Sequence, residues 1–275
     1  MSNPKHIGVV GLGAMGRPMA RHMMAAGYSV SGCDPNRDAQ QKAATLGVTV
    51  MANAADTARA SDFVQVVVGF DADVERVFFG GGGLMEAARP GLIVGIGSTI
   101  SPTFARELAE RTKDSGIVLI DMPLTRGQAA ADAGQMLVLG GGPKDVFETC
   151  RPVFETYASD VFWLGEFGAG QVAKMTNNMI LWACIAANDE AFRLAGGLGV
   201  DLDLLRTALC HSSAQNWAMS RNIQNDPMPW AEKDMVIAMA EADEVRMPLP
   251  LSMHVRELIK DLKIRHGYPT PKSPK

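Results

Sequence analysis

Short apolar runs alternate with longer stretches of mixed polarity through the first 165 residues of the chain. Runs of about five apolar residues bounded by Gly, Pro or Asp are typical of strands buried on both faces. They predict strands at residues 6–10, 29–33, 63–68, 92–96, 117–121, 136–139 and 161–164. Helical periodicity between them predicts helices at 15–26, 37–46, 102–115 and 144–156. This alternation predicts an α/β domain with a mostly parallel, doubly wound sheet.

The pattern changes after Gly165, beyond which no further strand is predicted. Residues 170–197 have the spacing of one long helix, and shorter helices are predicted near 201–211, 213–223, 230–243 and 250–265. A chain of 275 residues is long enough for two modest domains, since single cores stop growing near about 250–300 residues. We therefore expect domains at 1–165 and 166–275, the second smaller, all-helical and joined to the first by the long helix.

The composition says more about which kind of partner the protein binds than about its fold. A hydrophobic share of 47% is typical of a globular chain, and a net charge of −4 without a Lys/Arg-rich run argues against nucleic acid and favours a small molecule. The most apolar later run, 179–187, is far shorter than the roughly 20 residues of a membrane span. Four scattered cysteines without a CxxC motif predict reduced thiols in a cytoplasmic protein, and no histidine spacing indicates a metal site.

A glycine motif follows the first predicted strand and opens the first predicted helix. The segment Gly11-Leu12-Gly13-Ala14-Met15-Gly16 has the GxGxxG spacing of a Rossmann dinucleotide site. In that arrangement Gly11 permits the tight turn, Gly13 lets the backbone approach a pyrophosphate, and Gly16 lets helix and strand pack closely. The alternative is a glycine-rich turn that binds nothing.

Asp34, at the end of the second predicted strand, favours the dinucleotide site over the plain turn. An acidic residue at this place accepts hydrogen bonds from the adenosine ribose hydroxyls. Because a carboxylate also repels a 2′-phosphate, Asp34 favours NAD over NADP, although Arg37 could partly offset that preference.

Several longer motifs occur in one order along nearly the whole chain. The glycine motif extends to Gly-Leu-Gly-Ala-Met-Gly-Arg-Pro-Met-Ala at 11–20, and Asp-Met-Pro-Leu-Thr-Arg-Gly stands at 121–127. Residues 168–178 have the spacing GxGxxxKxxxN, and a weaker motif is Lys-Asp-Met at 233–235. Together they resemble the β-hydroxyacid dehydrogenase family, typified by 3-hydroxyisobutyrate dehydrogenase and related to 6-phosphogluconate dehydrogenase. They are much less specific for the substrate.

The resemblance implies a role for each motif residue. Lys174 would be the catalytic acid/base and Asn178 a substrate-binding amide. The nicotinamide ribose would contact Ser98 and Thr99. The substrate would be anchored by the loop Thr125, Arg126 and Gly127, and Lys233 would close the site over it.

These residue types suit the oxidation of an alcohol. A base must take the hydroxyl proton while a hydride leaves carbon for the nicotinamide, and a lysine can do this if its pKa is lowered towards neutrality. Lys174 and Asn178 are four residues apart, so they share a helix face. The alternatives are a solvated lysine at a helix start and a polar patch on an amphipathic helix.

Arg126 departs from the family pattern, which has glycine after Ser in Ser-Gly-Gly. Its planar fork suits a carboxylate, sulfonate or phosphate, so we expect it to bind the acid group of the substrate; the alternative is a surface arginine paired with Asp132. Three functions stay open: an NAD-dependent dehydrogenase of a small 3-hydroxyisobutyrate-like acid, a reductase of an anionic aldehyde such as tartronate semialdehyde or sulfolactaldehyde, and a non-catalytic NAD-binding protein. The face of the long helix around Trp182 predicts a homodimer or homotetramer.

Overall fold

The computed structural model describes residues 3–222 and 227–269 of the chain. The chain divides into two compact units, Met1–Lys174 and Met175–Lys275. The division falls inside the longest helix, α8 (Ala169–Gly197), after the boundary predicted at residues 165 and 166.

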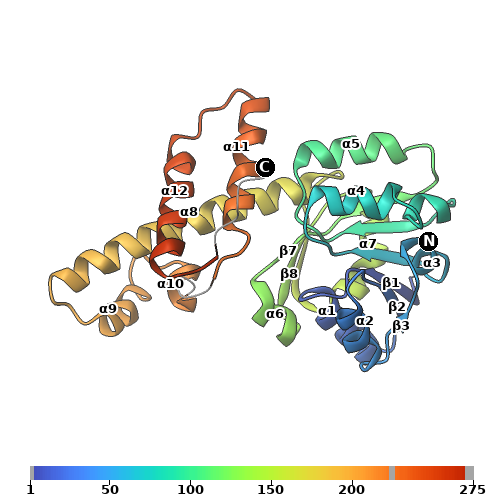
Figure 1. Ribbon diagram of the computed structural model, residues 1–275, viewed down its shortest axis with the longest axis horizontal. Helices are drawn as coiled ribbons and strands as arrows, with labels where there is room; N and C mark the ends of the chain where they lie inside the picture. The colour runs from blue at the N-terminus through green and yellow to red at the C-terminus, as the bar shows by residue number, and fades with distance from the viewer. Residues whose placement is uncertain (1–2, 223–226, 270–275) are drawn as a thin grey trace. The chain divides into compact units, whose positions relative to one another are not determined.

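Six parallel strands form the main sheet of the first unit, in the order β3-β2-β1-β4-β5-β6 (Figure 1). Their bounds are β1 (His6–Val10), β2 (Ser29–Cys33), β3 (Thr49–Val50), β4 (Phe63–Val66), β5 (Ile93–Ile96) and β6 (Val118–Asp121). This is the strand order of the Rossmann fold, which reverses direction at β1 and β4. The doubly wound parallel sheet predicted from the sequence is confirmed.

Both faces of this sheet are covered by helices, so its strands are apolar on both sides. In β4, Phe63 packs into one core and Val64 into the other. The first core is covered by α1 (Gly16–Ala25), α2 (Arg37–Ala44) and α7 (Lys144–Phe154). The second is covered by α3 (Ala54–Arg59), α4 (Asp71–Phe79), the 3-10 helix η1 (Leu84–Ala87) and α5 (Pro102–Thr112). Figure 1 shows α4 and α5 opposite α1 and α2.

A second sheet of three strands belongs to the same unit and was not separated by the sequence pattern. It contains β7 (Leu124–Thr125), β8 (Met136–Gly140) and β9 (Ala158–Trp163), with α6 (Gly127–Ala133) between the first two. A backbone bridge joins the sheets, since Asp121 and Gly141 exchange two N–H···O bonds of 3.0 Å. The strands predicted at 136–139 and 161–164 therefore lie outside the doubly wound sheet, because a local pattern identifies a strand but not its partner.

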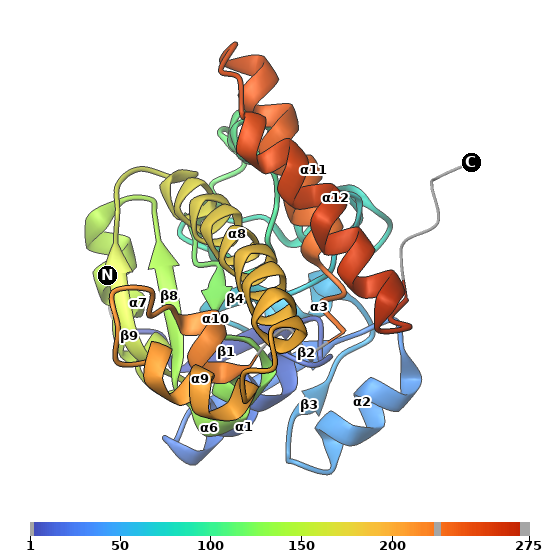
Figure 2. The same cartoon turned by 90° about the vertical axis from the view of Figure 1, so that its left-hand side faces the viewer.

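The described part of the second unit contains helices and no strand. After α8 follow α9 (Leu202–Leu209), α10 (Trp217–Arg221), α11 (Ala231–Glu244) and α12 (Pro250–Arg265). α11 and α12 lie side by side (Figures 1 and 2) and pack on α8 through a core that includes Trp182, Met235 and Ile259. Residue 223 of the helix predicted at 213–223 lies outside the described residues.

Among the residues that the structure describes, no helix is both long and apolar enough to cross a membrane. The same residues contain no cluster of three or more His, Cys, Asp or Glu side chains placed to hold a metal ion.

Candidate active site

The glycine loop connects β1 to α1 with the geometry that its motif requires. Gly11 has φ 100°, and a Cβ there would collide with the carbonyl oxygen of Val67. A Cβ on Gly16 would collide with the carbonyl oxygen of Gly11. Gly13 is exposed, and a Cβ on it would meet nothing within 4 Å. Two glycines thus permit the turn and the close packing, while the third leaves room for a pyrophosphate at the helix N-terminus.

Asp34 follows β2 and is tied to the glycine loop. Its Oδ2 accepts the Leu12 N–H at 2.8 Å, and its Oδ1 accepts the Asn36 N–H at 2.8 Å. Each carboxylate oxygen has a further lone pair for a ligand hydroxyl. The side chain is half-buried and held in place, and it fits the adenosine ribose of a dinucleotide.

The loop after β5 presents Thr99 between two buried neighbours, Ser98 and Ile100. The Ser98 hydroxyl accepts the Val68 N–H at 2.7 Å and donates to the Val66 carbonyl at 3.3 Å. Its hydroxyl therefore joins the ends of β4 and β5. Of the predicted pair, Ser98 is buried and Thr99 is half-exposed.

Two buried polar side chains behind this loop were missed by the sequence analysis. Gln171 Oε1 accepts the Ile100 N–H at 3.1 Å, and Nε2 donates to the Ser98 carbonyl at 3.0 Å. The backbone N–H of Gln171 donates to Asp121 Oδ2 at 2.9 Å. Burial raises the pKa of Asp121 to about 6, although backbone N–H groups near the start of α8 favour its carboxylate. A seven-residue spacing from Gln171 to Asn178, which puts both amides on one helix face, was the available signal.

The predicted substrate loop has a strained backbone. Thr125 is buried at the end of β7, and the next residues, Arg126 and Gly127, have φ of 78° and 73°. A side chain in this left-handed region costs about 1–2 kcal/mol, which glycine avoids. Arg126 therefore stands at a position whose backbone favours glycine.

Arg126 is paired with β9. Its Nη1 donates to Asp160 Oδ2 at 2.7 Å, to Ser159 Oγ at 2.8 Å and to the Gln135 carbonyl at 3.2 Å. The Ser159 hydroxyl and the Arg126 guanidinium lower the pKa of Asp160. Asp132, the partner considered from the sequence, instead accepts a hydrogen bond from Gln128. The ion-pair partner of Arg126 is therefore Asp160.

Lys174 and Asn178 lie one turn apart on α8, the first half-buried and the second 4% exposed. Asn178 Oδ1 accepts from Asn177 Nδ2 at 2.9 Å, and its Nδ2 donates to Asp234 Oδ2 at 2.8 Å. The same carboxylate oxygen accepts the Trp182 indole N–H at 3.1 Å. Asp234 belongs to the Lys-Asp-Met motif, which does not by itself identify it as the partner of Asn178.

Lys233, next to Asp234 on the first turn of α11, is half-buried, with its Nζ 5.9 Å from the centre of the Trp230 ring. Its neighbours are both anchored, Asp234 to α8 and Glu232 to Lys263 of α12 through a buried ion pair of 2.8 Å. The backbone that carries Lys233 is therefore fixed from two sides.

The structure groups the predicted residues within each unit. In the first, Gly11, Asp34 and Ser98 follow the carboxyl ends of parallel strands, so they line one edge of the sheet, where open α/β sheets bind ligands. In the second, Asn178 contacts the neighbour of Lys233.

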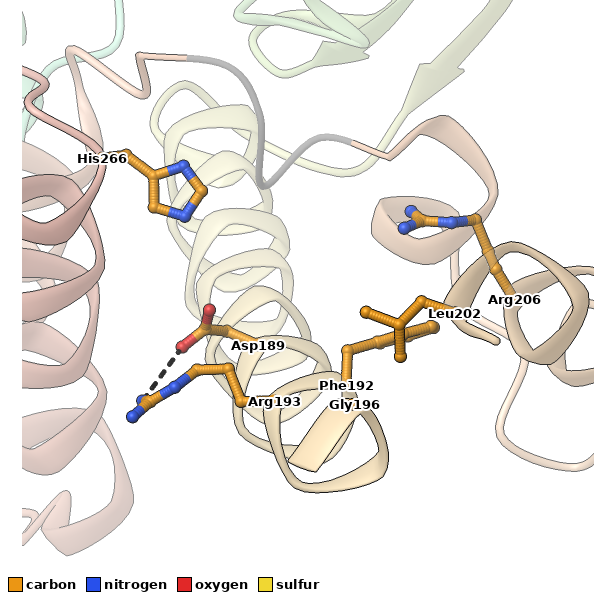
Figure 3. A pocket seen from close by; sticks show the side chains of 7 residues that line it. All are labelled: Asp189, Phe192, Arg193, Gly196, Leu202, Arg206 and His266. Carbon is orange, nitrogen blue, oxygen red and sulfur yellow. Dashed lines mark ion pairs between the residues drawn. The ribbon is translucent and has the colours of Figure 1, made fainter. Parts of the chain in front are cut away.

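A hollow of about 350 Å³ in the helical unit contains none of the predicted site residues (Figure 3). Arg206 of α9 lies 5.0 Å from the centre of the Phe192 ring, and Arg193 pairs with Asp189 at 3.7 Å. Its other lining residues are Gly196, Leu202 and His266. The hollow therefore has no part in the predicted chemistry.

Two family models cover most of the chain. Residues 6–165 match the NAD binding domain of 6-phosphogluconate dehydrogenase. Residues 168–270 match the NAD-binding region of NADP-dependent 3-hydroxyisobutyrate dehydrogenase.

Individual proteins are similar over the same length. The 3-hydroxyisobutyrate dehydrogenase of Pseudomonas aeruginosa is 35% identical, with 92% of this chain and 90% of that one covered. The L-threonate dehydrogenase of Cupriavidus necator is 31% identical, covering 92% and 89%. A structure of Mycobacterium tuberculosis 3-hydroxyisobutyrate dehydrogenase with L-serine superposes with a TM-score of 0.83 at 29% identity, covering 97% of this chain and 95% of that one.

Proposed function

The chain belongs to the β-hydroxyacid dehydrogenase family, and we propose that it interconverts a small β-hydroxy acid and its oxo form, with Lys174 as the catalytic acid/base. The membership confirms the resemblance drawn from the motifs, and with it an oxidoreductase that uses NAD. The names of the relatives differ in substrate, so the substrate of this chain is part of the proposal.

We assign the cofactor to the carboxyl edge of the parallel sheet. When bound, NAD takes up the hydride from the hydroxyl-bearing carbon. The segment Gly11–Gly16 would hold the pyrophosphate, Asp34 the adenosine ribose and Thr99 the nicotinamide ribose, with Ser98 supporting Thr99 from behind. Because Leu12 and Asn36 hold the Asp34 carboxylate, it cannot easily turn away from a 2′-phosphate, and this favours NAD over NADP.

Lys174 would accept the hydroxyl proton in oxidation and return it in reduction. Asn178 supports this assignment because its partners fix the direction of its amide. Its oxygen accepts from Asn177 and one of its N–H bonds donates to Asp234, so the group it offers a substrate oxygen is the other N–H. An N–H directed at that oxygen orients it towards Lys174, one turn earlier.

The acid group of the substrate is assigned to the loop of Thr125, Arg126 and Gly127. The side-chain hydrogen bonds of Arg126 within the described residues all use Nη1, so the edge formed by Nε and Nη2 suits a carboxylate or sulfonate. An arginine where the family has glycine also favours a second candidate function, reduction of a small anionic aldehyde such as tartronate semialdehyde or sulfolactaldehyde by the same residues.

We further propose a homodimer or homotetramer formed through the helical unit. α9 has no buried residue, and three large apolar side chains are about two-thirds exposed or more: Leu194 on α8, Leu198 just after it and Leu204 on α9. A second copy would cover them. Light scattering should give a multiple of 29.4 kDa, and a monomeric mass would contradict this. The cysteines, all free, agree with the cytoplasm as the expected location.

The test of the function is NADH formation and consumption with a panel of acids: 3-hydroxyisobutyrate, glycerate, threonate, 3-hydroxypropionate and 2,3-dihydroxypropanesulfonate, with the corresponding aldehydes in reverse. We expect one acid to turn over with NAD, and Lys174→Ala to lower kcat by about 10²–10⁴-fold without changing NADH affinity. Lys113→Ala, which removes an exposed lysine paired with Glu110, is the control and should leave kcat unchanged. Full activity of Lys174→Ala would refute the assignment.

A further inference from the structure

Gln171 is a fully buried amide three residues before Lys174, and the main chain occupies both of its hydrogen-bonding groups. Its oxygen accepts from the N–H of Ile100 and its nitrogen donates to the carbonyl of Ser98. These two partners flank Thr99. The side chain thus pairs with the loop as a neighbouring strand would, and fixes the peptide units on both sides of Thr99.

We propose that Gln171 is a positioning residue that sets the distance between the Lys174 amine and the cofactor-binding loop at Thr99. The proposal rests on the dehydrogenase function proposed above. Lys174 follows Gln171 by three residues on a continuous helix, so the backbone of Lys174 moves with that of Gln171. The loop is locked to the same residue through Ser98 and Ile100.

Asp121 completes the connection to the sheet. Its carboxylate accepts the backbone N–H of Gln171, and its own backbone forms the bridge with Gly141. Glycine at 141 and 170 makes this possible, because a Cβ at either position would lie against the Asp121 carboxylate. Both ends of Gln171 are therefore held, the backbone by Asp121 and the side chain by the loop.

Such positioning affects the chemical step more than cofactor binding. Proton and hydride leave the same substrate carbinol, so both acceptors must be in place together. A displacement of about 1 Å can cost on the order of 100-fold in rate. The glycine loop and Asp34, which we assign to the pyrophosphate and the adenosine ribose, have no hydrogen bond with Gln171.

The first test is Gln171→Leu, which keeps the size of the side chain and removes both hydrogen bonds. We expect kcat to fall by about 100-fold, with the Kd for NADH changed by less than about threefold. The matched control is Gln65→Leu, which removes another fully buried amide of this unit, bonded to the Tyr157 hydroxyl and the Met23 sulfur. It should lose stability and keep kcat.

The second test is Gln171→Glu, whose function depends on protonation. A protonated carboxyl reproduces both bonds, because its O–H donates to the Ser98 carbonyl and its C=O accepts the Ile100 N–H. An ionised carboxylate cannot donate and repels that carbonyl. We therefore expect kcat relative to wild type to fall by about tenfold as pH rises from about 5.5 to about 8.5. Asp121 accepts the Gln171 N–H, and Asp71 accepts the N–H and hydroxyl of Ser101, which follows Ile100. These carboxylates and Lys174 are present in both proteins, so dividing the kcat of the variant by that of wild type removes most of the pH dependence that they cause.

These experiments distinguish a failure of the proposed function from a failure of the positioning role of Gln171. A wild-type protein that binds NADH but turns over no hydroxy acid or aldehyde would contradict the proposed function. An active wild type whose Gln171→Leu variant keeps kcat, or whose Gln171→Glu variant gives a ratio independent of pH, would overturn the positioning role alone. If Gln171→Leu does not fold, the Gln171→Glu ratio decides.

Discussion

The first turns of α8 and the turns that follow are held by different kinds of contact. Gln171, near the start, is bonded to backbone groups of the Ser98–Ile100 loop and to Asp121. Asn178, two turns later, is bonded to Asp234 of α11. One helix thus carries the proposed proton-transfer group, close to the contacts of the first unit, and the proposed substrate amide, which is bonded within the helical unit. The comparison suggests that Lys174 and Asn178 can be disturbed separately.

The largest expected effect comes from closing the space beside Asp121. A Cβ on Gly170 would collide with the Leu139 carbonyl and lie 2.8 Å from Asp121 Oδ2, so Gly170→Ala should lower the free energy of unfolding by about 4 kcal/mol. At the other end of α8, Gly197 has nothing within 4 Å of its Cβ position. Gly197→Ala should change stability by at most about 1 kcal/mol, in the favourable direction. Chemical denaturation measures the free energy of unfolding of both variants. Equal losses in the two would contradict the close packing of Gly170 against Asp121 and Leu139.

The contact between Asp121 and the start of α8 can next be tested through the pH dependence of stability. Burial raises the pKa of Asp121 to about 6, from an ordinary value of 3.8, so folding favours the protonated acid. Its contribution is fully present below pH 3.8 and is lost as pH rises through about 6, by up to about 3 kcal/mol. Asp121→Asn resembles the protonated acid and should lack this loss. If the free energy of unfolding changes with pH in the same way in wild type and in Asp121→Asn, Asp121 does not titrate in this way.

The contact between Asn178 and Asp234 should contribute less to stability than the contacts of Asp121. Asp234→Ala leaves the donors of Asn178 and Trp182 without their acceptor, which should cost about 2 kcal/mol of stability and raise KM for the hydroxy acid about tenfold. Asp234→Asn keeps an acceptor oxygen and should recover more than half of both losses. The distinguishing result is the Kd for NADH, which we expect to stay constant. A loss of NADH affinity would mean that the contacts of Asp234 and those of Gln171 are energetically coupled.

The smallest effect is expected at Arg126. Arg126→Ala and Arg126→Gly both remove the guanidinium, and each should raise KM for the acid about tenfold, or about 1.4 kcal/mol. Glycine also relieves the left-handed backbone at φ 78°, so its variant should be about 1 kcal/mol more stable than the alanine variant. An unchanged KM in both would remove Arg126 from the substrate site.

Much of the fold could be predicted because its signals are local. The strands at 6–10 and 29–33 have the predicted bounds, and each is followed directly by a glycine or an aspartate. The two-residue strands β3 and β7 carry no comparable pattern. The separate sheet of β7–β9 depends on pairing with residues far along the chain, and such pairing leaves no trace in one run of sequence.

The local geometry of the candidate site was predictable where a motif fixes the backbone, and less so where a side chain is held by a partner distant in sequence. Gly11, Gly13 and Gly16 have the turn, the open space and the close packing expected of them. The partner of Arg126 was not predictable, because Asp160 lies on another strand while Asp132 is near in sequence. Gln171 and Asp234 both lie within the motifs, but the motifs do not identify their partners. Gln171 is bonded to Ser98 and Ile100, and Asp234 to Asn178, which are all distant in sequence.

Proton transfer by Lys174 can be tested by chemical rescue. Lys174→Ala would be assayed at saturating NAD and substrate with increasing concentrations of ethylamine, and with trimethylamine at equal ionic strength as the control. We expect ethylamine to restore turnover in proportion to its concentration, and the bulkier, branched trimethylamine not to do so. A variant that binds NADH normally and either works without an amine or is rescued by none would contradict it.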